Sequence, residues 1–304
     1  MIYSIHLNHK IATTMQPYSS IKLITITLAL LTISACSMNK MVVDMSMPMI
    51  ESGIDAMNYE TDLQLAEDSM PANLAMLNGM INLDPENAQL HTYAAQAYYG
   101  LSYGFNEDSQ PERGETFYLR GLKHGLTALE LNGAKNLRNG TIASFQEQVA
   151  RMDEDDVATM FWTAGNWAKW VDMNRDDAEA IAQLVRATAL MQRVIEIDDT
   201  YYYGGAHMFF GVYYGSRAPL IGGNFSKSLE HFDRAREITD GKLLIADLLQ
   251  AQYLARQQQD QQDFHNRLTS VVNAPENLMP EVSLQNKIAK RKAAYLLNKE
   301  SEWF

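Results

Sequence analysis

Residues 195–215, IEIDDTYYYGGAHMFFGVYYG, contain the two local patterns that decide the fold. The segment opens with Ile195-Glu-Ile-Asp198, an aliphatic–polar–aliphatic–acid sequence that is typical of a helix end. It continues into an aromatic run that is interrupted by small residues at 204–206 and 211, which allow helices to approach closely. We therefore expect one helix to end at Asp198 and the next to begin near residue 204.

Both patterns recur along the chain. Similar helix endings occupy residues 81–84, 129–132 and, less closely, 238–240. An aromatic phrase follows two of these endings, as Tyr98-Tyr99-Gly100 and as Tyr213-Tyr214-Gly215. The endings are about 48, 66 and 43 residues apart, whereas tetratricopeptide repeats keep a period of about 34. The pattern predicts an all-α fold, a compact bundle of helical hairpins built on degenerate tetratricopeptide-like repeats.

The sequence from residue 51 onward has one character. Ala, Leu, Met, Gln and Glu dominate, and apolar residues recur with helical spacing rather than in the alternation of strands. Asp84-Pro85-Glu86 ends one helix and starts the next, because Asp caps a helix well and Pro fits its first turn. We expect residues 51–304 to form a single helical domain.

The N-terminus has the features of an export signal with a lipidation site. Residues 23–35 form an apolar run that follows Lys22 and is shorter than the ~20 residues that span a bilayer. The run ends in Ile33-Ser34-Ala35-Cys36, which matches the bacterial lipobox and contains the only cysteine of the chain. We expect residues 1–35 to be a lipoprotein signal peptide and Cys36 to be acylated.

The residues around the signal refine this expectation. Met15 is an alternative start that would leave Lys22 as the basic region of a shorter signal. Ser37, rather than Asp, follows the cysteine and favours the outer over the inner membrane. Residues 36–50 are rich in Met and lack a clear period, so we expect the lipidated cysteine to be followed by a flexible tether. The protein is then periplasmic and held at the membrane by the acyl chains on Cys36.

The net charge and the absence of known motifs argue against several classes of function. Removing residues 1–35 takes away two lysines and no acidic residue, which changes the formal net charge from −12 to −14 and argues against nucleic-acid binding. The five remaining histidines are far apart in the sequence, without metal-ligand spacing, and no known catalytic motif is present. We expect no enzyme activity, no cofactor and no metal site.

Aromatic segments provide the candidate binding residues. Trp162, Asn166 and Trp170 share one helical face, and an amide between two tryptophans is less typical of pure core because a buried amide needs partners. Arg217 follows the aromatic run in a Ser-Arg-Ala-Pro turn and could anchor a carboxylate, although a helix-terminal arginine is the plainer reading. The expected cleft residues are Trp162, Asn166, Trp170, Tyr203, His207, Tyr213, Tyr214 and Arg217.

Several segments also resemble one known family, the T-component lipoproteins of tripartite ATP-independent periplasmic (TRAP) transporters, sometimes called TatT-like proteins. In chain order these segments are INLDPENAQLHTYAAQAYYGLSYGFNED, FYLRGLKHGLTALEL, FWTAGNWAKWVD, ALMQRVIEIDDTYYYGGAHMFFGVYYGSRAPLIGGNFSKSLEHFDRA, AQYLARQQQDQQDF and NKIAKRKAAYLL. Asp199 departs from the family, which often has Pro at this position after the helix ending.

The resemblance implies a lipid-anchored periplasmic homotrimer with a cavity or channel in each subunit. It also implies association with a periplasmic solute-binding P-component and a small, partly hydrophobic ligand. The carboxylate suggested by Arg217 is a further option for this ligand. The alternative is a tetratricopeptide-like scaffold lipoprotein that organises envelope or outer-membrane assembly. The residues alone predict only an anchored helical scaffold.

Overall fold

The computed structural model describes residues 17–304, with side chains from residue 38 onward. The first part of the expected signal peptide, including the alternative start at Met15, and the side chain of Cys36 lie outside the described residues. The described chain consists of helices joined by turns and contains no strand, which confirms the all-α fold. None of the described helices is long and apolar enough to span a bilayer.

The chain divides into two units, residues 1–47 and 48–304. Helix α1 (Pro17–Asn58) runs through both of them, and Pro48 lies at their boundary. Residues 38–50 are therefore helical and not the irregular tether expected from their composition. Methionine is a good helix former, and no glycine occurs before Gly53, so a segment without clear periodicity can still be a helix.

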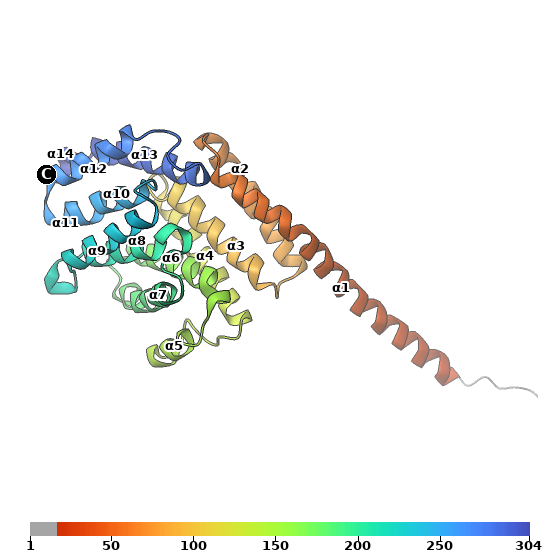
Figure 1. Cartoon of the computed structure of the whole chain (residues 1–304). Helices are drawn as coiled ribbons and strands as arrows, with labels where there is room; N and C mark the ends of the chain where they lie inside the picture. Colours follow the sequence, from red (N-terminus) through yellow and green to blue (C-terminus); the bar gives the residue numbers. More distant parts are fainter. Residues whose placement is uncertain (1–16) are drawn as a thin grey trace, which may run out of the picture. The chain divides into compact units, whose positions relative to one another are not determined.

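The unit formed by residues 48–304 is built from antiparallel helix pairs (Figure 1). Helix α2 (Leu63–Leu83) leads into α3 (Ala88–Leu101), which pairs with α4 (Pro111–Leu131). Three further pairs follow along the chain: α6 (Val157–Met173) with α7 (Ala178–Ile197), α8 (Tyr201–Gly215) with α9 (Phe225–Ile238), and α12 (Gln261–Asn273) with α13 (Ser283–Asn298). Shorter helices complete the unit: α5 (Ile142–Val149), α10 (Ile245–Leu249), α11 (Arg256–Gln258) and α14 (Glu300–Trp303).

Capping residues fix the starts of the helices. Asn87 begins α3, and its side-chain oxygen accepts a hydrogen bond from the Leu90 amide at 3.1 Å. Asp177 begins α7 in the same way through the Glu179 amide at 2.8 Å. These side chains satisfy amide groups that a helix leaves without an internal partner.

Glycines allow α4 and α6 to pack with their backbones close together. A Cβ atom placed on Gly125 would lie 2.2 Å from Oγ1 and 3.0 Å from Cα of Thr163. A Cβ on Gly121 would meet the side chain of Asn166 at a similar distance. The main hydrophobic core lies along this contact and includes Trp167, one of the largest fully buried side chains.

Substituting Gly125 by Ala should destabilise the protein by about 1–3 kcal/mol, because α4 and α6 must separate to admit a methyl group. Urea unfolding followed by circular dichroism measures this change. Gly79 is the matched control, since it lies exposed within α2 with no atom near its missing Cβ, and Gly79→Ala should stabilise by up to ~1 kcal/mol. An unchanged midpoint for Gly125→Ala would show that the two helices are not locked together.

Two of the helix pairs each contain two histidines in direct contact. Nδ1 of His91 on α3 lies 2.9 Å from Nδ1 of His124 on α4, and His207 on α8 and His231 on α9 repeat this contact at 2.9 Å. Tyr98 stacks on His124, as Tyr214 stacks on His231. The internal repeat is thus visible in the structure, where Tyr98 corresponds to Tyr214 and not to Tyr213.

Lowering the pH should destabilise both pairs. Burial and the neighbouring ring lower the pKa of His124 and of His231 to about 4, from an ordinary value of 6.5. Between these values the unfolded chain binds more protons than the folded protein, so the free energy of unfolding falls as the pH drops from 6.5 to 4.

The double variant His124→Gln, His231→Gln should lose most of this pH dependence when Tm is measured from pH 7 to about 4. Glutamine can still donate a hydrogen bond to the remaining histidine of each pair. His265→Gln, on the exposed face of α12, is the control and should keep the pH dependence of the unsubstituted protein. If Tm changed equally with pH in all three proteins, the pH dependence would not come from the two histidine pairs.

Candidate functional site

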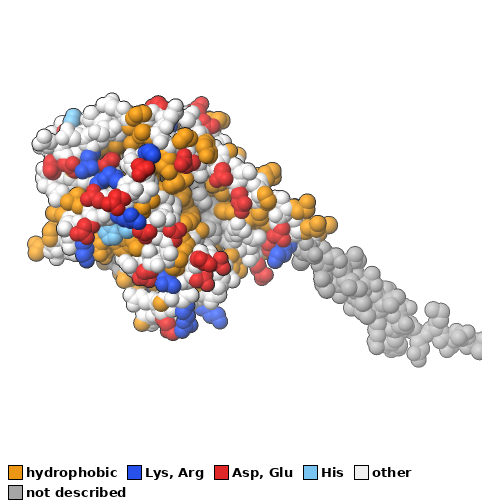
Figure 2. All heavy atoms as spheres, viewed as in Figure 1, with side chains coloured by type: hydrophobic (Ala, Val, Ile, Leu, Met, Phe, Trp, Pro, Cys, Tyr) orange, Lys and Arg blue, Asp and Glu red, His pale blue; other side chains and the backbone are white. Residues whose placement is uncertain are grey.

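A cavity of about 710 Å³ lies within the unit formed by residues 48–304. Helices α3, α6, α7 and α8 line the cavity, together with residues 49–58 of α1 and with α2, α10 and α13. Two short segments, residues 102–106 and 250–255, also contribute to the wall. On the face shown in Figure 2, hydrophobic side chains gather in a band across the middle of this domain. The volume falls in the range of ~300–1,000 Å³ that is usual for small-molecule sites.

Most of the wall is apolar and much of it is flexible. Six methionines from four different helices contribute, and their unbranched side chains adapt to irregular shapes. These methionines are Met49, Met57, Met70, Met76, Met191 and Met208. Such a wall suits a hydrophobic ligand without requiring one fixed outline.

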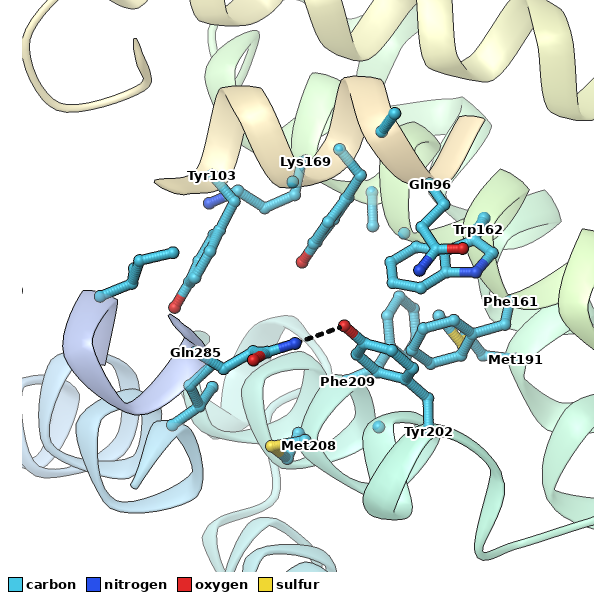
Figure 3. Close-up of a pocket in the computed structure, with 18 of the residues that line it drawn as sticks. Gln96, Tyr103, Phe161, Trp162, Lys169, Met191, Tyr202, Met208, Phe209 and Gln285 are labelled. Carbon is cyan, nitrogen blue, oxygen red and sulfur yellow. Dashed lines mark hydrogen bonds between the residues drawn. The ribbon is translucent and has the colours of Figure 1, made fainter. Parts of the chain in front are cut away.

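An aromatic cluster forms another part of the wall (Figure 3). The rings of Trp162 and Tyr202 meet edge-on with centroids 4.7 Å apart, and Phe161 packs against both. The Tyr202 hydroxyl lies 3.1 Å from Nε2 of Gln285 on α13, which donates a hydrogen bond to it. This bond joins α8 to α13 across the cavity.

The backbone that carries Tyr202 is strained. Tyr202, Tyr203 and Gly204 have φ values of 45°, 60° and 75°, so three consecutive residues are left-handed. This conformation costs roughly 1–2 kcal/mol for each non-glycine residue. The right-handed part of α8 begins only after Gly204, close to the start expected from the sequence. Backbone strain of this kind is concentrated at functional sites.

A buried ion-pair network lies behind one end of the cavity wall and reaches the cavity through Lys169. Lys169 of α6, which lines the cavity, lies 2.7 Å from Oε2 of Glu107, and Lys292 of α13 lies 2.7 Å from Oε1 of the same carboxylate. The Tyr118 hydroxyl donates a third hydrogen bond to Glu107 at 2.5 Å. Burial alone would raise the pKa of Glu107, but the two lysines outweigh it and hold this pKa at about 2.

Two π-helical segments bring tyrosines to the same end. Segment η1 (Ser102–Asn106) carries Tyr103, and η4 (Gln250–Ala255) carries Tyr253. The Tyr253 hydroxyl donates to Oδ2 of Asp172 at 3.2 Å. The Tyr103 hydroxyl is buried and has no hydrogen-bond partner among the described residues. Short π-helical segments within α-helices often mark functional sites.

Comparison with known proteins identifies the family. The sequence profile of the TRAP transporter T-component matches residues 59–304. The chain belongs to this family. No curated protein matches it. A T-component is an accessory, periplasmic-side component that associates with the other components of the transporter, and the family is not a known enzyme family.

Three of the expected cleft residues line the cavity of this T-component: Trp162, Tyr213 and Arg217. The Arg217 guanidinium stacks on the Tyr213 ring at 3.8 Å and donates from Nε and Nη2 to the Tyr213 carbonyl, at 3.1 and 2.7 Å. It therefore caps the end of α8 and contributes to the cavity wall at the same time. These contacts are those of an arginine at a helix C-terminus, the simpler of the two roles considered for Arg217 from the sequence.

The other five expected residues lie outside the cavity wall. Asn166 is fully buried, and its Nδ2 donates to the carbonyl oxygens of Ala95 and Trp162. Trp170 packs on the main core. It lies eight residues after Trp162, and over that distance the side-chain direction rotates by about 80° around the helix axis, away from the cavity. His207 and Tyr214 belong to the histidine pair with α9, and Tyr203 packs in a smaller core.

Several cavity residues were not expected from the sequence. Lys169 lies one residue before Trp170 in the aromatic segment of α6, and Tyr103 lies just beyond the Tyr98-Tyr99-Gly100 phrase. Tyr202 lies beside the expected Tyr203, but the left-handed turn directs it to the cavity. Gln285 carries no signal in the sequence, because its role depends on where α13 packs.

Neutralising Glu107 should destabilise the T-component. Glu107→Gln leaves two buried lysines without their shared carboxylate, and breaking a buried pair costs about 3–5 kcal/mol. Urea unfolding measures the loss. Glu276→Gln is the matched control, since Glu276 also bridges two lysines, Lys287 and Lys290, but is exposed, so little change is expected. Equal effects would mean that burial does not set the strength of the network.

Proposed function

We propose that this T-component is a lipid-anchored accessory subunit of a TRAP transporter that holds a small, partly hydrophobic ligand in its cavity. The family match over residues 59–304 carries the proposal. The size and the methionine and aromatic wall of the cavity support the ligand class. Trp162, Tyr213 and Arg217 are the sequence-derived candidates for contact with the ligand.

The anchor is an acylated Cys36 exposed by removal of residues 1–35. The lipobox at residues 33–36 supports it, and the acyl chains would hold the protein at the membrane with ~0.8 kcal/mol per buried CH₂. The outer membrane is the expected location, because Ser37 follows the cysteine. The family resemblance also supports a homotrimer, which sedimentation analysis would test.

The partner is the periplasmic solute-binding P-component. An exposed apolar turn supports a protein contact at the cavity edge, because Leu220 and Ile221 are 99% and 68% exposed and Ile221 also lines the cavity. Arg217 precedes this turn and is enriched, as a residue type, among those that dominate binding at interfaces. A ligand could then pass between the two proteins without crossing open water.

The test is affinity purification of the lipidated protein from cells that also produce the P-component. The P-component should be recovered, and Arg217→Ala should reduce recovery by roughly fivefold or more, with only a small fall in Tm from the lost contacts with Tyr213. Arg138→Ala is the control, because Arg138 is exposed and does not line the cavity.

Failure to recover the P-component with the unsubstituted protein would contradict the proposed partner. Recovery of envelope-assembly proteins in its place would favour the scaffold alternative. A large fall in Tm for Arg217→Ala would assign Arg217 to capping α8 instead of binding.

A further inference from the structure

Three tyrosines lie near the charged end of the cavity, and two of their hydroxyl groups donate to carboxylates. Tyr118 donates to Glu107 at 2.5 Å, and Tyr253 donates to Asp172 at 3.2 Å. The third, Tyr103, has a buried hydroxyl without a partner among the described residues. A buried hydroxyl without a partner is unfavourable, so a ligand that accepts this hydrogen bond would remove the penalty.

The Tyr103 hydroxyl is available as a donor at neutral pH. Burial raises its pKa well above the ordinary value, and the nearby Glu107 adds to this effect, so the proton stays on the oxygen. Figure 3 shows Tyr103 and Lys169 on one side of the cavity, with the aromatic cluster of Phe161 and Trp162 on the other. A polar group of a ligand could therefore accept from Tyr103 at one end of the cavity while the rest of the ligand contacts the aromatic cluster at the other end.

The charges near Tyr103 favour an anion. The ammonium groups of Lys292 and Lys169 lie 4.6 and 5.5 Å from the centre of its ring. Both oxygens of Glu107 are already bonded to the two lysines and Tyr118, and Glu107 does not line the cavity. Of this network, Lys169 lines the cavity, whereas Glu107 and Lys292 do not.

Lys169 keeps hydrogen-bonding capacity for a ligand. Its ammonium has three N–H donors, of which one is used on Glu107 at 2.7 Å, and Asp172 at 3.9 Å is too distant for a hydrogen bond. Asp172 itself accepts from Tyr253 and pairs with the half-exposed Arg175, whose Nε lies 2.8 Å away. Lys169 and Tyr103 are therefore two donors at the end of the cavity where Asp172 and Arg175 also form part of the wall.

We propose that Tyr103 and Lys169 form a headgroup site for the carboxylate of a single-chain amphiphile, with its hydrocarbon chain along the methionine and aromatic wall. The inference rests on the proposed function, because it assigns the chemical class of the ligand in the same cavity. The hydroxyl of Tyr103 and the free N–H groups of Lys169 bind the two carboxylate oxygens. The hydrocarbon chain contributes affinity in proportion to the apolar surface that it buries.

The experiment compares three probes with the same chain length: decanoate, 1-decanol and decylamine. Each is titrated at pH 7.5 into the lipidated protein in nanodiscs, with empty nanodiscs subtracted, and Trp162 in the cavity wall provides a fluorescence signal. Decanoate should bind about tenfold more tightly than decanol, since a hydrogen bond to a charged group is worth roughly 1.5–3 kcal/mol. Decylamine should bind more weakly than decanol, because its charge is like that of Lys169.

Two tyrosine variants separate binding from folding. Tyr103→Phe removes a hydroxyl that has no protein partner, so it should abolish most of the preference for decanoate while Tm and decanol affinity stay the same. Tyr118→Phe removes a hydroxyl that stabilises Glu107, so it should lower Tm and keep the preference for decanoate. This opposite pattern distinguishes a headgroup contact from a structural role.

Other results would overturn the inference. Equal binding of all three probes would leave the amphiphile cavity of the proposed function intact but remove the headgroup site. A preference for decanoate that survives Tyr103→Phe and disappears in Arg217→Ala would place the carboxylate at the end of α8. Absence of binding by every probe would contradict both the headgroup site and the ligand part of the proposed function.

Discussion

The buried carboxylate of Glu107 is the interaction on which the arrangement of this domain depends. It accepts from Lys169 of α6 and Lys292 of α13 and lies just beyond η1, so one side chain ties together segments from three regions of the chain. Buried charges are tolerated only when their partners are in place. The network therefore links the middle of α13 to α6, two helices that both contribute to the cavity wall.

The residues around the cavity depart from ideal helix geometry. Two π-helical segments carry Tyr103 and Tyr253, and a left-handed turn at Tyr202–Gly204 carries the ring that packs on Trp162. Each departure is less favourable than a regular helix. They persist because the surrounding hairpins, with their glycine contacts and histidine pairs, are packed firmly enough to hold them. The regular repeats thus provide the rigidity, and the irregular positions provide the site.

The polar groups of the cavity divide into two kinds. Arg217 and Gln285 take part in contacts that hold the wall together, through the Tyr213 carbonyl and the Tyr202 hydroxyl. Tyr103 has no such contact among the described residues, which is why its hydroxyl indicates a ligand more clearly than the charged residues do. In a T-component this distinction matters, because a cavity that is mainly apolar gives affinity, and a few polar groups give selectivity.

The sequence by itself determined the helical fold and the family, because apolar spacing, caps and close-packing glycines are local features that survive in any arrangement of the helices. It also identified the aromatic segments that contribute Trp162 and Tyr213 to the cavity. Only the tertiary structure decided which face of each helix meets the cavity. Asn166 and Trp170 lie four and eight residues after Trp162, and each step of four residues rotates the side-chain direction by about 40° around the helix axis. Both side chains therefore point into the core. Lys169, on the other side of Trp162, points to the cavity. Gln285 joins the site because α13 packs across it.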